Sequence, residues 1–487
     1  MCFAVIVGRR ASADGAVLFG HNEQNTEWNT INYRRIPRLT YPHGIRLKNG
    51  GLVTEIRDSY AFLWTEMPTR EFSDNCFNEW GVAVAGNGCP TREDDAEALT
   101  ARGLISEGGI GYMLPRLIAM GARTAREGVE LAGRLIGRFG YVATGRSLTI
   151  ADPNEAWVMS IARGRSWIAR RVPDDGVVII PNVHVIDAVD LEDQDNVIHS
   201  PGLVEYAVSR GWYDPAGGRP FSFRAAFSAP PVSTEMQYRH GCDSRQWHGQ
   251  ALITGQHAEL TDRTELPFAV RPQRKLTVAD VAAVLRSHLD GTDYDWRRQS
   301  PHRSPHHPEE GIDHSFAREA CNIATQESVV FQLRGWLPAA IGCVAWRANA
   351  VPCTSIYTPW YQGIDETPPT FHRACDIETQ LDLTHHFGQD LDYYRQRRDL
   401  AFHPFHRLAM LADRDYDRRL AVIAPLRDKF ETTGYALQTA VEQTAEALQA
   451  KDPGLMRAYL TDYTAGRALQ AGALASELVA RFEAEER

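Results

Sequence analysis

The chain has no long apolar run and no excess of positive charge. No hydrophobic stretch approaches the roughly 20 residues of a membrane-spanning helix. The apolar start has no basic leader before it, so we expect no secretory signal. The 52 lysines and arginines are outnumbered by 62 aspartates and glutamates, which gives a formal net charge of -10 and disfavours nucleic-acid binding. These absences predict a cytoplasmic protein with neither nucleic acid nor a membrane as a partner.

The chain also lacks closely spaced cysteine pairs. It has eight cysteines, none of them in a C-x-x-C pair: Cys2, Cys76, Cys89, Cys242, Cys321, Cys343, Cys353 and Cys375. The usual zinc and redox spacings are therefore excluded. In a reducing cytosol we expect mostly free thiols, no metal and no cofactor.

One histidine-rich stretch, residues 299–314, is the exception to consider. Its histidines are His302, His306, His307 and His314, and they could bind a metal ion. Pro305 and Pro308 disfavour the helix that would place His302 and His306 on one face. Because metal sites need ligands in fixed geometry, we expect a solvated surface loop instead.

The remaining pattern predicts paired strands alternating with helices. Strands are expected at 82–86, 147–151, 156–161 and 177–181, with a turn at 152–155 that joins the second and third into a hairpin. Thr124 and Glu127 are typical of a helix start, and Gly140 ends that helix. From about Leu391 the chain reads as helical to its end. This order favours an α+β fold with antiparallel sheets covered by helices, and the helical tail as a scaffold or an oligomer surface.

The second residue is the strongest functional candidate. Cys2 follows Met1 and opens an apolar strand over residues 2–8. Removal of Met1 would leave one residue with both a thiol and a free α-amine. The amine has an ordinary pKa of about 7.7–8.0, so it can accept a proton near neutral pH and activate the thiol as a nucleophile. The alternative is a small buried hydrophobic residue.

A polar cluster is predicted to lie beside Cys2. Asp14-Gly15 indicates a tight turn, and the strand expected at 16–20 ends in the polar stretch 21–25, HNEQN. A hairpin would bring this cluster back to the N-terminus, where any residue assisting Cys2 is expected. The alternative is an ordinary solvated loop.

Several short motifs, in order, resemble those of the cysteine dipeptidase D and secernin family of N-terminal nucleophile (Ntn) hydrolases. The matching pieces span nearly the whole chain: Met1-Cys2, GHNEQ at 20–24, NEWGVA at 78–83, TARE at 124–127, IADPNEAW at 150–157, PN at 181–182, TQES at 325–328, TSIYTPWY at 354–361, DP at 452–453 and LTDY at 460–463. No single motif is decisive, but their shared order makes chance agreement implausible.

The resemblance implies a four-layer αββα sandwich with the nucleophile on a central strand. It implies a catalytic domain at 1–390 and a helical extension at 391–487. It further implies that Cys2 is the nucleophile, that Asn87, in a loop after a strand, contributes to the oxyanion hole, and that Asn182 is a second site asparagine. A distal arginine completes such sites, and Arg245 is our choice over Arg239. As alternatives, Asn87 could be a turn residue and Asn182 a strand cap.

Two positions depart from the family pattern. Where the family has Arg or Lys and, three residues later, Asp, this chain has His21 and Gln24. Gln24 can hydrogen-bond but carries no charge, and His21 can be neutral or cationic near neutral pH. Glu23 is adjacent, but neighbouring strand residues face opposite ways, so it is not assumed to compensate.

The function predicted is hydrolysis of dipeptide amide bonds through a Cys2 thioester, without a cofactor. Two alternatives stay open. One is an acylase-type amidase acting on N-acyl substrates, which differs only in pocket shape. The other is a secernin-like regulatory protein with little hydrolysis, which the departures at His21 and Gln24 favour. A homo-oligomer is possible.

Overall fold

Two antiparallel β-sheets form the centre of the molecule. A computed structural model describes residues 2–25, 31–71, 75–229, 233–256, 260, 266–295, 297, 304–306 and 319–487. The first sheet has the order β12 (Val177–Ile180), β1 (Phe3–Val7), β2 (Val17–Gln24), β14 (Thr325–Leu333), β15 (Cys343–Asn349), β16 (Thr358–Tyr361). The second has the order β13 (Val197–His199), β11 (Trp167–Arg171), β10 (Ala156–Gly164), β9 (Tyr141–Ala151), β8 (Ala83–Gly88), β7 (Asn75–Asn78), β6 (Phe62–Glu66), β3 (Asn32–Ile36).

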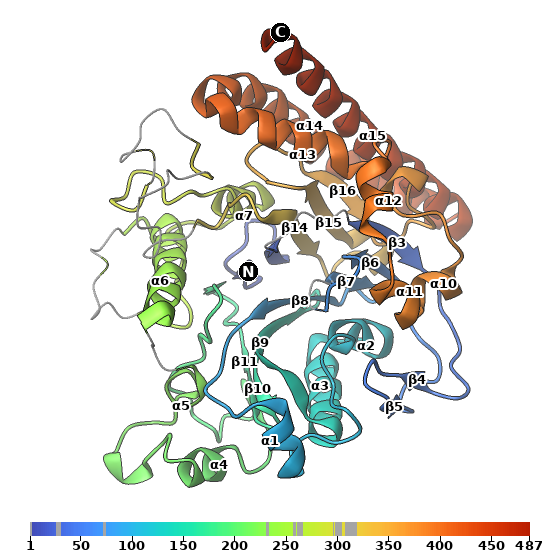
Figure 1. Cartoon of the computed structure of the whole chain (residues 1–487). Helices are drawn as coiled ribbons and strands as arrows, with labels where there is room; N and C mark the ends of the chain where they lie inside the picture. The colour runs from blue at the N-terminus through green and yellow to red at the C-terminus, as the bar shows by residue number, and fades with distance from the viewer. Residues whose placement is uncertain are drawn as a thin grey trace.

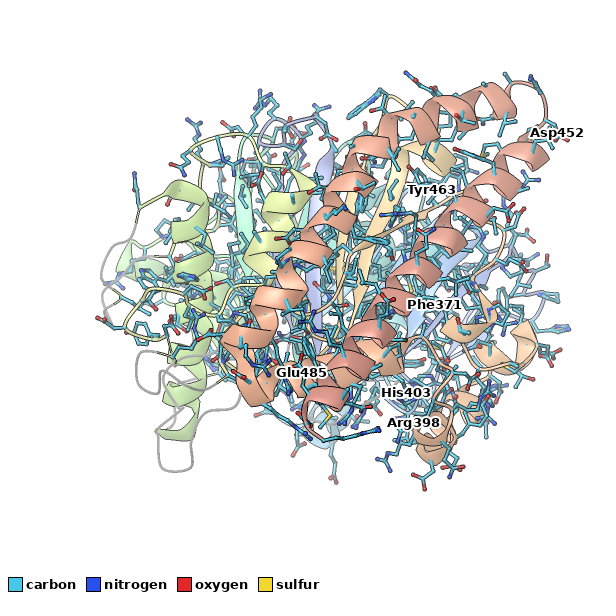
Figure 2. All side chains as sticks on the ribbon, turned by 90° about the horizontal axis from the view of Figure 1, so that it is seen from above. Phe371, Arg398, His403, Asp452, Tyr463 and Glu485 are labelled. Carbon is cyan, nitrogen blue, oxygen red and sulfur yellow. The ribbon has the colours of Figure 1, made fainter. Side chains whose placement is uncertain are left out.

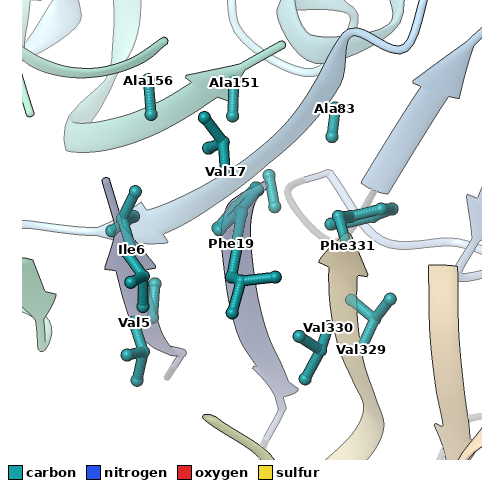
Figure 3. Packing of buried hydrophobic residues seen from close by; sticks show 14 of the residues in the cluster. Val5, Ile6, Val17, Phe19, Ala83, Ala151, Ala156, Val329, Val330 and Phe331 are labelled. Carbon is teal, nitrogen blue, oxygen red and sulfur yellow. The ribbon is translucent and has the colours of Figure 1, made fainter. Parts of the chain in front are cut away.

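The sheets pack through alternate side chains of their strands. Val17, Phe19 and Phe331 point from the first sheet toward Ala83 and Ala151 of the second (Figure 3). The small alanines leave room for the large rings of the opposite sheet, and all these side chains are buried. Strand periodicity therefore assigns the odd-numbered residues of β2 to the space between the sheets.

Helices cover the outer face of each sheet (Figure 1). On the second sheet lie α2 (Leu114–Gly121) and α3 (Ala125–Phe139), and on the first lie α7 (Val278–Leu285), α14 (Tyr416–Gln449) and α15 (Pro453–Glu485). The last two run antiparallel and turn at Asp452 (Figure 2). The four layers are helix, sheet, sheet, helix, so the predicted α+β sandwich is confirmed.

The remaining elements lie at the edges of the sheets and in the connections. They are β4 (Ile45–Arg46), β5 (Leu52–Val53), α1 (Ala96–Ala101), α4 (Leu203–Ser209), η1 (Pro215–Gly217), α5 (Phe223–Phe227), α6 (Ser233–Thr254), α9 (Ala339–Gly342), η2 (Pro369–Phe371), α10 (Ile377–Leu381), α11 (Leu383–Phe387), α12 (Leu391–Gln396), α13 (Phe402–Ala412) and η3 (Asp413–Asp415). Among the helices of the described ranges, none is both long and apolar enough to span a membrane.

Several local expectations agree with the structure, and others need correction. The side chain of Thr124 accepts a hydrogen bond from the Glu127 amide at the start of α3, and the predicted hairpin is β9–β10. The polar stretch 21–25 was expected to follow a strand that ends at Gly20, but β2 continues to Gln24 with every residue buried, which rules out the alternative of a solvated loop. Asn87 likewise lies within β8 rather than in a loop after it.

The histidine-rich stretch is also not the expected solvated loop at the one histidine that the structure describes. His306 is only 5% exposed. Its ring lies against His288 and Tyr416, so tertiary packing overrides the local composition. His302, His307 and His314 lie outside the described residues.

Candidate active site

Cys2 lies immediately before β1 and faces the space between the two sheets. The β1–β2 register pairs Phe3 with Asn22 and Ala4 with His21, so Cys2 falls opposite Glu23. The Cys2 thiol donates a hydrogen bond to Oε1 of Glu23, with a sulfur–oxygen distance of 3.3 Å. Cys2 is 5% exposed, so the thiol and the carboxyl group of Glu23 lie together in a nearly closed site.

His21 shares this side of the sheet with Glu23. A ring nitrogen of His21, a carboxylate oxygen of Glu23 and the Cys2 sulfur all lie within 4.8 Å of one another. Both His21 ring nitrogens are buried, and a hydrogen bond with the backbone of Gly86 favours the charged form of the ring.

Gln24 lies on the opposite face of β2, which corrects its predicted position beside Cys2. Gly20, four residues earlier, lies on the same face of β2. A side chain at that position would meet Val281 and Leu285 of α7, so this face is the outer one. The Gln24 amide donates to the Ala320 carbonyl at 2.7 Å, and Asn22 donates to the same carbonyl at 2.8 Å. Gln24 therefore anchors the outer face of the first sheet. Strand alternation instead brings Glu23 to the thiol.

Asn87 and Asn182 connect the two sheets next to Cys2. Nδ2 of Asn87 on β8 donates to the Ile180 carbonyl of β12 at 3.2 Å. Nδ2 of Asn182, just after β12, donates to the Gly88 carbonyl at 2.9 Å. These reciprocal bonds fix both amides at the end of β12, which is the strand that pairs with β1.

Arg245 of α6 joins this group from outside the sheets. Nη1 donates to the backbone carbonyl of Cys2 at 3.2 Å, and Nη2 donates to Oδ1 of Asn182 at 2.9 Å. Arg245 is buried, at 1% exposure. The guanidinium thus fixes the backbone of the candidate nucleophile relative to Asn182.

Electrostatics in the site follow from burial and from close charges. Burial raises the pKa of Glu23 well above its usual range, and the neighbouring Cys2 adds to the increase. Burial lowers the pKa of His21, which Glu23 and Glu327 only partly offset, so the imidazole is neutral at neutral pH. Arg146 of β9 adds a buried positive charge that acts on both Cys2 and Glu23.

Sequence reasoning missed two members of this site. Glu23 was set aside although the hairpin register identifies it: paired residue numbers in β1 and β2 sum to 25, as for Phe3 and Asn22. Arg146 is one arginine among many, and the residues around it in the sequence do not mark it as part of a site. It reaches the site because β9 is the neighbour of β8 at Asn87.

The arrangement can perform nucleophilic attack at a carbonyl. It combines a thiol at the head of a central strand, a carboxyl group beside it, two fixed amides and a nearby arginine. Thiol, imidazole and carboxylate are also ligand types for zinc, so metal binding by Cys2, His21 and Glu23 is a second possibility to test. Together with the four layers, an N-terminal thiol on a central strand defines the class of N-terminal nucleophile hydrolases.

The chain belongs to peptidase family C69, whose model matches residues 1–389. It is similar to a probable dipeptidase of Salmonella dublin, with 30% identity over 380 residues that cover 76% of this chain and 82% of that protein. It is also similar to probable dipeptidase B of Lactococcus lactis subsp. lactis, with 26% identity over 496 residues that cover 99% and 94%. A solved penicillin V acylase from Agrobacterium tumefaciens matches at 12% identity and a TM-score of 0.32, covering 74% of this chain and 86% of that one. The family expected from the motifs is confirmed.

Proposed function

We propose that this chain is a dipeptidase with Cys2 as its nucleophile after removal of Met1. The observation that carries the proposal is the Cys2 thiol, hydrogen-bonded to Glu23 and with its backbone carbonyl bound by Arg245. Membership of a peptidase family and the dipeptidase names of the relatives support the substrate class. Residues 1–390 are proposed as the catalytic unit and 391–487 as a helical extension packed on it.

The reaction proceeds in two covalent steps. The α-amine of Cys2 takes the thiol proton, the sulfur attacks the substrate carbonyl carbon, and the amine then gives the proton to the leaving amino group as the C–N bond breaks. Water attacks the resulting thioester, losing a proton to the α-amine, and the carboxylic acid leaves with the thiol regenerated. Glu23 positions the α-amine, while Asn182 and Arg245 position the Cys2 backbone.

The experiment that tests the proposal combines intact mass with a substrate panel. We expect the purified native protein to lack Met1 and to hydrolyse unmodified dipeptides. Cleavage of N-acyl amino acids but not of dipeptides would instead identify an acylase-type amidase. A processed N-terminus with no hydrolysis of either panel would favour a regulatory protein, and hydrolysis by protein that retains Met1 would contradict the α-amine as base.

Replacing Asn87 with leucine is expected to lower kcat and kcat/KM together by about 10²-fold. One amide hydrogen of Asn87 is engaged by the Ile180 carbonyl, and the other is proposed to stabilise the developing oxyanion, a contribution of about 10²–10³-fold at such sites. Steady-state kinetics, with thermal unfolding as the check on folding, make the measurement. A variant that folds and retains the wild-type kcat would remove Asn87 from the mechanism.

Adding EDTA to the assay is expected to leave the initial rate unchanged, because the thiol route uses no metal. The alternative is that Cys2, His21 and Glu23 hold a catalytic metal ion. In that case chelation would abolish hydrolysis, and zinc or manganese would restore it. If Tm is unchanged in EDTA, that outcome would replace the proposed thiol mechanism with metal-assisted hydrolysis.

A further inference from the structure

We propose that His288, His306, Cys321 and Cys353 form a tetrahedral zinc site that joins loops at one end of the first sheet and, through the contact of His306 with Asp413, connects them to the C-terminal helices. All four side chains are buried, and one potential ligand atom from each lies within 4.8 Å of all the others. The group is separate from the Cys2 site, because it follows α7 on the outer face of the first sheet whereas Cys2 faces the second sheet. The proposal does not depend on the proposed function.

The distances in this group fit the edges of a zinc tetrahedron. Nε2 of His306 lies 2.9 Å from Nε2 of His288, 3.6 Å from the sulfur of Cys353 and 3.8 Å from the sulfur of Cys321. Zinc–nitrogen bonds of about 2.0–2.1 Å and zinc–sulfur bonds of about 2.3 Å imply edges of about 3.3 Å between nitrogens and about 3.6 Å between nitrogen and sulfur. The three distances from His306 therefore differ from these edges by only a few tenths of an ångström, and the other three edges lie within 4.8 Å.

A carboxylate lies behind His306, as it commonly does behind zinc-bound histidines. Nδ1 of His306 lies 2.8 Å from Oδ1 of Asp413. A proton on Nδ1 donated to this carboxylate leaves the Nε2 lone pair directed at the other three ligands, which is the usual role of a carboxylate behind a metal-binding histidine. Ser304 supports the arrangement, since its hydroxyl donates to Asp413 at 2.5 Å and accepts from the His306 amide at 3.0 Å.

Apolar side chains pack against the two cysteines, and the charge of the ligand set favours a divalent ion. Val351, Ala409 and Tyr416 pack around the two cysteines. Two thiolates and one Zn²⁺ make a net neutral site, whereas a bare thiolate in such surroundings would be strongly destabilised. Two thiolates with two imidazoles form one of the common ligand sets of closed, structural zinc sites.

The ligands come from segments far apart in the chain, and this gives the site its structural role. His288 follows α7, Cys321 precedes β14, and Cys353 follows β15. Asp413 begins the turn between α13 and α14. An ion here would tie the loops at one end of the first sheet to the helices that cover it, and its binding energy would add to the free energy of unfolding.

The test is the metal content and ligand set of the full-length protein, purified with reductant and without chelator. We expect about one zinc per chain by elemental mass spectrometry. X-ray absorption should show about two sulfur ligands near 2.3 Å and two nitrogen ligands near 2.0 Å, and cobalt substitution should give thiolate charge-transfer and tetrahedral visible bands. These wild-type measurements remain decisive even if a ligand variant fails to fold.

Matched variants locate the ion. Cys321→Ser/Cys353→Ser should lose the zinc and lower Tm by several degrees, while Cys76→Ser/Cys343→Ser, which removes two equally buried thiols elsewhere, should keep it. Cys2→Ala should also keep it, and loss in that variant would assign the ion to the active-site group. Protein without zinc after reconstitution, a Cys321–Cys353 disulfide in peptide mapping, or zinc retained by Cys321→Ser/Cys353→Ser would overturn the proposal.

Discussion

Replacing Cys2 with alanine is expected to lower kcat/KM for dipeptides by about 10⁴-fold or more, a loss typical of removing a nucleophile. Alanine has neither sulfur nor oxygen with which to form an acyl-enzyme. Its small side chain still permits removal of Met1, so the α-amine base remains. Among the described residues the thiol hydrogen-bonds to Glu23 alone, and Tm should therefore change little. Steady-state kinetics with intact mass and thermal unfolding make the measurement.

A buried cysteine elsewhere supplies the control for this variant. Cys343, at the start of β15, is fully buried and outside the site. Cys343→Ser should retain the wild-type kcat/KM even where it lowers Tm. Substantial dipeptide hydrolysis by Cys2→Ala of confirmed mass would show that the nucleophile is another group.

The fold and the candidate nucleophile could be predicted because their signals are local. An apolar strand behind Met1-Cys2 and a tight turn at Asp14-Gly15 are enough to build the first hairpin, and capping residues locate α3. Side-chain direction was the harder step. The choice between Glu23 and Gln24 depends on the exact register of the strand pair. A register shift of one residue would move every side chain of the strand to the opposite face.

The groups that assemble from distant segments could not be predicted in the same way. Arg245 was selected from sequence only through the family resemblance, and its bonds to Cys2 and Asn182 come from packing of α6. The cluster of His288, His306, Cys321 and Cys353 has none of the short spacings by which zinc sites are recognised. Its members meet only because α7, β14, β15 and the C-terminal helices pack together.

Replacing Glu23 with glutamine is expected to lower kcat/KM by about 10²–10⁴-fold, the usual contribution of general acid–base catalysis, here by the α-amine that Glu23 positions. The carboxyl group lies 3.3 Å from the Cys2 sulfur, so the α-amine of the same residue lies within the range of strong charge effects. The positive N-terminus counteracts the burial that raises the pKa of Glu23 and so favours the carboxylate. Glutamine preserves the shape of the side chain but removes the charge that orients the amine toward the thiol. The measurement is the pH dependence of kcat/KM.

The direction of the pH shift separates this role from simple packing. A carboxylate beside the α-ammonium stabilises the charged form and raises its pKa above the usual value of about 7.7–8.0. The amine must be unprotonated to accept the thiol proton, so Glu23→Gln should move the acid limb of the profile to lower pH while the plateau falls. Gln24→Asp is the matched control: it adds a carboxylate on the opposite face, beside the Ala320 carbonyl, and should leave the limb in place. If the acid limb shifts in Gln24→Asp but not in Glu23→Gln, residue 24 rather than residue 23 lies beside the α-amine. That result would contradict the strand register.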